Sequence, residues 1–201
     1  MVYKVSLVGT HGTGKTVLMD LVKAELKKRS IEAVTIEELS TQARNLGLPI
    51  NQETTLASQL WILHSQFAQE LYLSEEIKGR VKNEVIICDR GIDNYCYLEH
   101  SVGENLHAKR LTLGHMQHFP YNQIYLLPII NQEIANNDLR ATDKQFQQTM
   151  DQKIRQFLNE YDIEHTILPI PDQEDSYRQI WVKTIVNQSL EDLNKCKTEL
   201  M

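Results

Sequence analysis

The sequence has few cysteines and no long hydrophobic run, and each shortage excludes a class of protein. The three cysteines, Cys88, Cys96 and Cys196, are an odd number without CxxC spacing, which predicts reduced thiols in a cytoplasmic protein and no zinc knuckle. No apolar run approaches about 20 residues, so no membrane-spanning segment is expected. The first predicted strand begins at Val2 without a basic and apolar leader, so no signal peptide is expected.

Positive charge is also in short supply. The 201 residues include 21 lysines and arginines against 27 aspartates and glutamates, which gives a net charge of −6. Because neutralised phosphates supply most non-specific affinity for nucleic acids, this balance argues against a protein that coats DNA or RNA. With 5 prolines, 8 glycines and 41% hydrophobic residues, the chain is expected to be globular and to form a single domain over 1–201.

Strand and helix patterns alternate along the chain. Short apolar runs predict strands at 2–8, 33–36, 85–88, 122–127 and 165–168. Apolar residues at helical spacing predict helices over 16–29, 52–78, 144–160 and 175–197. This alternation predicts an α/β fold in three layers, with a five-stranded parallel sheet and helices on both faces. The polar stretch 131–143 is predicted to form a small lid.

A phosphate-binding loop is predicted between the first strand and the first helix. Residues 9–16 read GTHGTGKT and fit the pattern GxxxxGK[ST] in the strand–helix context that this motif requires. The residues expected to hold the nucleotide are Gly9, Thr10, His11, Gly12, Thr13, Gly14, Lys15 and Thr16. Glycines let the backbone N–H groups converge on an anion, and the helix adds its positive dipole end.

Two side chains of this loop have separate expected roles. Lys15 is expected to reach the β- and γ-phosphates, and the Thr16 hydroxyl is expected to ligate Mg²⁺. ATP and Mg²⁺ are therefore the expected cofactors. The sequence does not decide between ATP and GTP as the phosphate donor.

The third predicted strand runs directly into Asp89 and Arg90. An acid at the C-terminal end of such a strand is typical of a Walker B element, and ligands of open α/β sheets bind at that edge. Asp89 is predicted to hold Mg²⁺, directly or through water, and Arg90 to clamp a phosphate or the acceptor. The alternative is an ordinary Asp–Arg turn on the surface.

Signatures of two other nucleotide-binding classes are missing. The only Asn-Lys pair is Asn194-Lys195, and the aspartate that completes the NKxD motif of GTPases does not follow it. A signature of the ABC type, similar to LSGGQ, is absent as well. A small phosphotransferase or a small ATPase remains.

Further residues follow the phosphate-binding loop in an order that resembles a known family. They are Glu38 before Arg44, Gln66 and Glu70 on the long helix, Asp89-Arg90-Gly91 followed by Asp93 and Tyr97, and Asp138-Leu139-Arg140. Together they resemble the nicotinamide riboside kinase domain of bacterial NAD regulators and its AAA-like P-loop relatives. More distantly, the pattern is similar to deoxynucleoside and thymidylate kinases. The resemblance implies a P-loop kinase fold and leaves the substrate open.

The acceptor is expected near the end of the second strand, where Glu37 and Glu38 follow Ile36. A carboxylate there accepts the proton of an attacking hydroxyl or orients it. Strand alternation and the family pattern favour Glu38 over Glu37, and two solvated acids are the alternative. Arg44 either favours a monophosphate acceptor, pairs with Glu38 or lies on the surface. The carboxylate favours an alcohol.

Other polar and aromatic residues allow two interpretations each. Gln66 and Glu70 either line the acceptor pocket or lie on the surface, and Arg140 either brings a cation to the transferring phosphoryl group or lies on an ordinary loop. Trp61, Tyr95 and Tyr97 either fill the core or stack on a base. The histidines at 107, 115 and 118 are interpreted as exposed, and the C-terminal helix with Trp181 is a candidate dimer surface.

The function predicted from these patterns is an ATP- and Mg²⁺-dependent phosphotransferase that acts on a nucleoside or a similar small hydroxyl compound. The expected catalytic residues are Lys15, Glu38, Asp89, Arg90 and Arg140, and the expected metal ligands are Thr16 and Asp89. One alternative is a nucleoside monophosphate kinase. Another is a nucleotide-binding ATPase or regulatory switch without a small-molecule acceptor. The sequence names neither the acceptor nor the oligomeric state.

Overall fold

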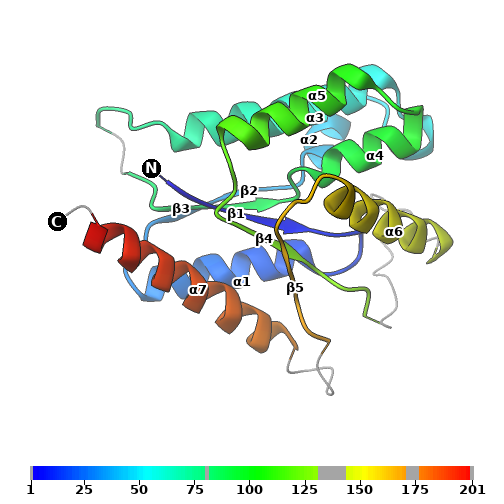
Figure 1. Ribbon diagram of the computed structural model, residues 1–201. Helices are drawn as coiled ribbons and strands as arrows, with labels where there is room; N and C mark the ends of the chain where they lie inside the picture. Colours follow the sequence, from blue (N-terminus) through cyan, green and yellow to red (C-terminus); the bar gives the residue numbers. More distant parts are fainter. Residues whose placement is uncertain (1, 80–81, 131–143, 171–176, 200–201) are drawn as a thin grey trace.

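The computed structural model describes residues 2–79, 82–130, 144–170 and 177–199, and the chain folds around a single sheet (Figure 1). The five strands are all parallel, in the order β2-β3-β1-β4-β5, which confirms the predicted α/β fold. Their bounds are β1 (Tyr3–Val8), β2 (Ala33–Ile36), β3 (Val85–Asp89), β4 (Gln123–Leu126) and β5 (Thr166–Ile167). The predicted lid at 131–143, with Arg140, lies outside the described residues.

Helices cover both faces of the sheet, as predicted. They are α1 (Lys15–Lys28), α2 (Leu39–Asn45), α3 (Leu56–Ser74), α4 (Asp93–Val102), α5 (Leu106–His118), α6 (Lys144–Glu160) and α7 (Tyr177–Glu199), with a 3₁₀ turn, η1, at Asn51–Glu53. Helices α1 and α7 lie on one face, and α3 to α6 lie toward the other (Figure 1). Strand alternation explains this division, because Val5 and Leu7 face α1 and α7 while Val8 faces the opposite core.

The register of the central strands places the predicted site residues next to each other. Leu7 of β1 pairs with Asp89 at the end of β3, and β1 leads directly into the phosphate-binding loop. Ile36 of β2 pairs with Cys88 on the other side of β3. The C-terminal ends of β1, β2 and β3 therefore meet at one edge of the sheet, where α/β proteins bind ligands.

Helix α3 is shorter at both ends than the predicted 52–78. It begins after Thr55, whose hydroxyl accepts a hydrogen bond from the Ser58 backbone N–H and caps the helix, while η1 remains a separate turn. It ends at Ser74, and the acidic residues Glu75 and Glu76 follow. Negative charge is unfavourable at the C-terminal end of a helix dipole, which disfavours continuation to Gly79.

A buried polar cluster lies between the sheet and helices α3 and α5. It corrects the expectations for three residues. Gln66 and Glu70 are fully buried, and neither is among the residues that line the cavity beside Glu38 and Arg90. Glu70 accepts hydrogen bonds from Lys4 Nζ at 3.0 Å and from Gln66, and its Oε2 lies 2.9 Å from His115 Nε2. His115 is therefore buried, whereas His107 and His118 are exposed as expected.

The need for this cluster follows from the sequence of β1. Lys4 projects into the same face as Val8 and is 5% exposed, so its ammonium needs buried partners. Burial alone would raise the pKa of Glu70, but the His115 hydrogen bond, the Lys4 charge and the Tyr121 hydroxyl hold it below its usual value. The Tyr121 hydroxyl, 2.6 Å from Glu70 Oε1, also lies beneath Gly91, where a Cβ would come within 2.7 Å of it.

Exchange of His115 for glutamine tests the cluster. We expect His115→Gln to lower the free energy of unfolding by about 1–3 kcal/mol, because the ring stacked on Phe67 is removed and a flexible amide has to replace the imidazole as the partner of Glu70. His118→Gln on the same helix is the control and should change it by less than about 0.5 kcal/mol. Chemical denaturation measures both values. Equal effects of the two substitutions would contradict a buried role for His115.

Helix α7 does not present Trp181 as a dimer surface. The indole is fully buried in the core between α1, α7 and the sheet, and its Nε1 donates a hydrogen bond to the Pro169 carbonyl at 2.7 Å. Its large apolar surface and its N–H group are therefore both accommodated inside this chain. Among the helices in the described part of the chain, none is long and apolar enough to cross a membrane.

Candidate functional site

The loop between β1 and α1 has the backbone conformation of a phosphate cradle. Gly9, Gly12 and Gly14 all have positive φ angles, and Gly14, at φ 85°, lies directly before the first residue of α1. A side chain at Gly9 would lie 3.1 Å from the carbonyl oxygen of Leu127. The glycines thus allow a left-handed turn and close approach to β4, which other residues would strain.

Lys15 is buried at the start of α1 and folds back over the loop. Its Nζ donates hydrogen bonds to the carbonyl oxygens of Gly9 at 2.8 Å and Thr10 at 2.7 Å. Thr13 also closes the loop by donating its hydroxyl to the Thr10 carbonyl at 2.9 Å. Burial lowers the pKa of Lys15 to about 8, and the nearby Arg90 charge acts in the same direction. An anion in the cradle would stabilise the ammonium that burial disfavours.

Thr16 and Asp89 come together as the sequence predicts for two metal ligands. The Thr16 hydroxyl donates a hydrogen bond to Asp89 Oδ2 at 2.5 Å, across the gap between α1 and the end of β3. Asp89 is 1% exposed, and its Oδ1 makes no hydrogen bond with any residue that the structure describes. Burial, opposed by the Lys15 charge, raises the pKa of this carboxyl. A buried oxygen without a partner beside a hydroxyl suits a hard cation such as Mg²⁺.

Arg90 follows Asp89 in a backbone conformation that arginine rarely adopts, with φ at 80°. Its Nε and Nη2 donate hydrogen bonds to Glu38 Oε1 at 3.1 and 3.0 Å. The side chain is 5% exposed, so it forms no surface turn. Its interactions with Tyr97, Glu38 and Asp93 keep the pKa of the buried guanidinium raised against the effect of burial.

Asp93 connects the phosphate-binding loop to the turn after β3. The sequence did not assign Asp93 a role of its own. Its carboxylate is fully buried and accepts hydrogen bonds from the backbone N–H groups of Gly91 at 2.9 Å and Gly9 at 3.3 Å. Its Oδ2 also lies 3.6 Å from Arg90 Nη1. Asp93 therefore ties the first residue of the phosphate-binding loop to the turn after β3.

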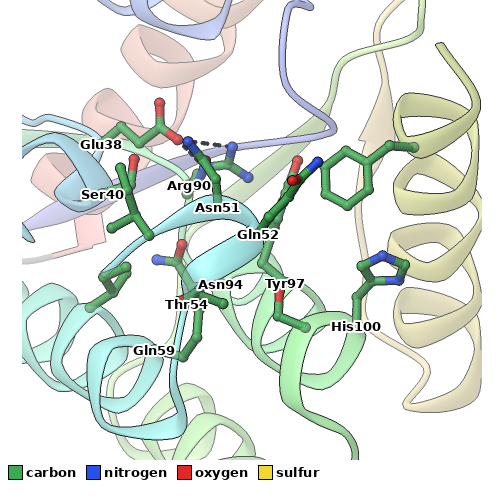
Figure 2. Close-up of a pocket in the computed structure, with 14 residues that line it drawn as sticks. Glu38, Ser40, Asn51, Gln52, Thr54, Gln59, Arg90, Asn94, Tyr97 and His100 are labelled. Carbon is green, nitrogen blue, oxygen red and sulfur yellow. Dashed lines mark hydrogen bonds and ion pairs between the residues drawn. The ribbon is translucent and has the colours of Figure 1, made fainter. Parts of the chain in front are cut away.

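A cavity of about 360 Å³ opens beside the phosphate cradle (Figure 2). Its polar side chains come mainly from η1, the start of α3 and α4, and the cavity lining includes Ser40, Asn51, Gln52, Thr54, Gln59 and Asn94. Glu38 and Arg90 line both this cavity and the small cleft formed by the phosphate-binding loop. The two spaces thus share a charged pair at their boundary.

The structure also separates the two adjacent acids after β2. Glu38 is partly buried and lines the cavity, whereas Glu37 is exposed. Arg44 is exposed in the last turn of α2 and is absent from the cavity lining. The geometry therefore brings Glu38, and neither of the other two, to the cradle.

The aromatic residues considered for base stacking divide between core and cavity. Tyr95 is fully buried, with its ring 5.3 Å from that of Phe157. Trp61 packs against the small cluster that includes Leu39. Tyr97 is the member of this group that lines the cavity.

The first turn of α6 contacts both spaces, which no sequence motif indicated. Gln147 Nε2 donates a hydrogen bond to the His11 carbonyl at 2.9 Å, and the Phe146 ring lies 5.3 Å from the His11 ring. Phe146 also lines the cavity. An amphipathic pattern predicts helix α6 correctly, but it does not reveal which residues of its first turn meet the phosphate-binding loop.

The lowered pKa of Lys15 predicts a pH-dependent affinity for nucleotides. Below pH 8 the ammonium is charged and binds phosphate, and above pH 8 binding must also take up a proton. We expect the affinity for ADP to fall about tenfold between pH 7 and pH 9, and calorimetry at several pH values measures it. Lys15→Arg should remove this dependence, because arginine stays protonated. A flat profile for the unaltered protein would contradict the assignment.

The comparison with known proteins agrees with this geometry. A protein-family model described as an AAA domain matches residues 4–175. The chain belongs to this AAA domain family. No curated protein sequence matches the chain.

The structure of this chain is similar to solved structures of NadR. A crystal structure of NadR protein in complex with NR has a TM-score of 0.69 and 14% identity, and the match covers 92% of this chain and 51% of NadR. A second, of NadR in complex with NAD and AMP-PNP, has a TM-score of 0.66 and 14% identity, with 92% and 49% covered. This chain thus spans about half the length of the NadR chains that it matches. The likeness confirms the P-loop nucleotide-binding fold and the resemblance to NadR-type P-loop proteins that the sequence indicated.

Proposed function

We propose that this protein transfers a phosphoryl group from Mg²⁺-bound ATP to a hydroxyl group of a small, uncharged molecule of nucleoside size. The observation that carries the proposal is the boundary between the two spaces, where Glu38 and Arg90 line both the phosphate cleft and the cavity. A donor phosphate in the cleft and an acceptor in the cavity would meet at this pair. Transfer between two bound molecules depends chiefly on such positioning and on charge stabilisation.

The residues of the cradle would bind and orient the donor. The backbone of 9–16 and the start of α1 would surround the phosphates, and Lys15 would exchange its two loop carbonyls for phosphate oxygens. Thr16 and Asp89 would hold Mg²⁺, which neutralises charge on the phosphates when it is bound. Arg90 would offer its N–H groups to the transferring phosphoryl group.

Glu38 would act on the acceptor. It is the carboxylate at the boundary, and a carboxylate in hydrogen-bonding reach of a hydroxyl can accept its proton or orient it for attack. Arg90 holds Glu38 at this boundary through two hydrogen bonds to Oε1. Glu38 is therefore proposed as the residue that activates the acceptor, in preference to the exposed Glu37.

The lining of the cavity favours an uncharged acceptor over a monophosphate. Amides and hydroxyls dominate its polar part, and Arg90 is the one arginine or lysine in the lining among the described residues. Since its guanidinium already pairs with Glu38, a second phosphate would lack a dedicated cation. The aromatic ring of Phe146 suits a planar base or a similar ring.

The NadR structures support a small-molecule ligand of this class, but their own ligands are not assigned to this chain. NadR binds NR in one structure, and NAD with AMP-PNP in the other, on a fold that this chain shares. The proposal for this chain still depends on its own cavity, because 14% identity carries the fold alone.

The test is a direct assay with labelled ATP, Mg²⁺ and a panel of nucleosides, sugars and nucleoside monophosphates. We expect labelled phosphate on the hydroxyl of at least one uncharged acceptor, identified by mass spectrometry. Phosphorylation of monophosphates alone would instead support a nucleoside monophosphate kinase. Tight nucleotide binding with slow, acceptor-independent hydrolysis would overturn the proposal in favour of an ATPase or a regulatory switch.

A further inference from the structure

The Arg90 guanidinium has one contact that does not use its hydrogen-bond donors. Its Cζ lies 4.0 Å from the centre of the Tyr97 ring, within the range of a cation–π interaction. Glu38 and Asp93 contact the nitrogen atoms of the same guanidinium. Glu38, directly before α2, and Asp93 and Tyr97, both on α4, thus surround one cation.

We propose that Tyr97 is a positioning residue for phosphoryl transfer, because its ring holds the Arg90 guanidinium at the boundary between the phosphate cleft and the acceptor cavity. This inference rests on the function proposed above. It adds to that function the residue that keeps Arg90 in place during the reaction.

The need for such a residue follows from what happens to Glu38. In the structure, Nε and Nη2 of Arg90 are engaged by Glu38. When Glu38 turns to an acceptor hydroxyl, Arg90 loses these two hydrogen bonds, and Asp93 touches it only through a longer contact of 3.6 Å. The Tyr97 ring keeps its contact in either arrangement, since a π face attracts the whole cation.

The π face of the Tyr97 ring occupies none of the N–H donors of Arg90. Arg90 Nη1 is buried and makes no hydrogen bond to any described residue. A second carboxylate in place of Tyr97 would occupy these N–H groups and compete with phosphoryl oxygens. An aromatic face fixes the cation without this competition, which suits a guanidinium that has to bind a substrate.

The hydroxyl of Tyr97 contributes less than the ring to holding Arg90. It is buried, faces Thr10 and Arg90, and makes no hydrogen bond of good geometry to any residue described. Burial raises its pKa although the Arg90 charge opposes the shift, so the phenol stays neutral and is no candidate for a base. The ring should therefore account for most of the effect of Tyr97.

Two substitutions separate the ring from the hydroxyl. With an acceptor found in the assay above, we expect Tyr97→Phe to keep kcat within about threefold of the unaltered protein. Tyr97→Leu should lower kcat about ten- to thirtyfold, because the cation–π interaction is lost. The KM for the acceptor should stay within about threefold in both, since the ring acts on Arg90. Tyr97→Met is a second non-aromatic variant if Tyr97→Leu fails to fold, as circular dichroism would show.

A binding measurement tests Tyr97 without any acceptor. A non-hydrolysable ATP analogue should bind the unaltered protein more tightly than ADP does, because Arg90 contacts the terminal phosphate. Tyr97→Leu should reduce this preference toward unity, while Tyr97→Phe retains it. If no acceptor is phosphorylated, the proposed function fails, and this ratio still decides the role of Tyr97.

Three results would overturn the inference. Equal losses in Tyr97→Phe and Tyr97→Leu would show that the hydroxyl acts. A loss confined to the KM of the acceptor would make Tyr97 only a wall of the cavity. An unchanged preference for the ATP analogue in Tyr97→Leu, or in Tyr97→Met in its place, would show that the ring does not position Arg90.

Discussion

Lys15→Ala is expected to reduce phosphotransfer at least about a thousandfold, because it removes the one lysine whose ammonium reaches the phosphate cradle among the described residues. The substitution takes a positive charge from a site that holds three carboxylates. This loss of charge opposes binding of a triphosphate. Calorimetry with Mg²⁺-bound nucleotides and the labelled-ATP assay measure the two effects.

Lys27→Ala serves as the matched control for this substitution. Lys27 lies on the same helix, in its last turn, and is exposed. It should leave nucleotide affinity and turnover within about twofold, since an exposed charge more than a Debye length away is screened. If Lys15→Ala behaved like Lys27→Ala, residues 9–16 would not be a working phosphate site, and the proposed function would fail with them.

Glu38→Gln should lower kcat by about 10²–10⁴-fold and leave the affinity for ADP within about threefold, because the amide cannot accept the proton of the acceptor hydroxyl. The amide oxygen can still accept hydrogen bonds from Arg90, so the boundary between cleft and cavity should keep its shape. Initial rates at saturating ATP and acceptor, together with ADP calorimetry, measure the difference.

The neighbouring acid provides the control. Glu37→Gln removes the same charge one residue away on an exposed side chain, and it should leave kcat within about twofold. Equal losses in the two variants would indicate a general effect of charge, and no loss in either would show that the acceptor is activated by another group.

The strands, the phosphate-binding loop and the acid after β3 could be predicted because each depends on local sequence. β-branched runs, the spacing of Gly9, Gly14 and Lys15, and the position of Asp89 after an apolar strand are all visible within a few residues. The parallel order of the sheet then brings Asp89 beside Thr16 without further information.

The cavity could not be predicted, because its lining comes from segments far apart in the sequence. Asn51, Gln52 and Thr54 resemble an ordinary polar loop, and only the fold places them opposite Asn94 on α4 and Phe146 on α6. The burial of His115 was misjudged for the same reason, since nothing near it in the sequence shows that Glu70 and Lys4 approach it. The positive φ of Arg90 has no signal in the sequence at all.

The closeness of Gly91 to Tyr121 joins the buried cluster to the edge of the sheet that carries the proposed site. Gly91 follows Arg90 directly, and the space beneath it is filled by the Ser6 and Tyr121 hydroxyls. A protein engineer who repacks the α3–α5 side of the sheet for heat resistance would therefore also shift the support of Arg90, and turnover would change with melting temperature. Helix α7 packs against α1 on the opposite face of the sheet, away from this contact, so stabilising substitutions on α7 are the safer choice.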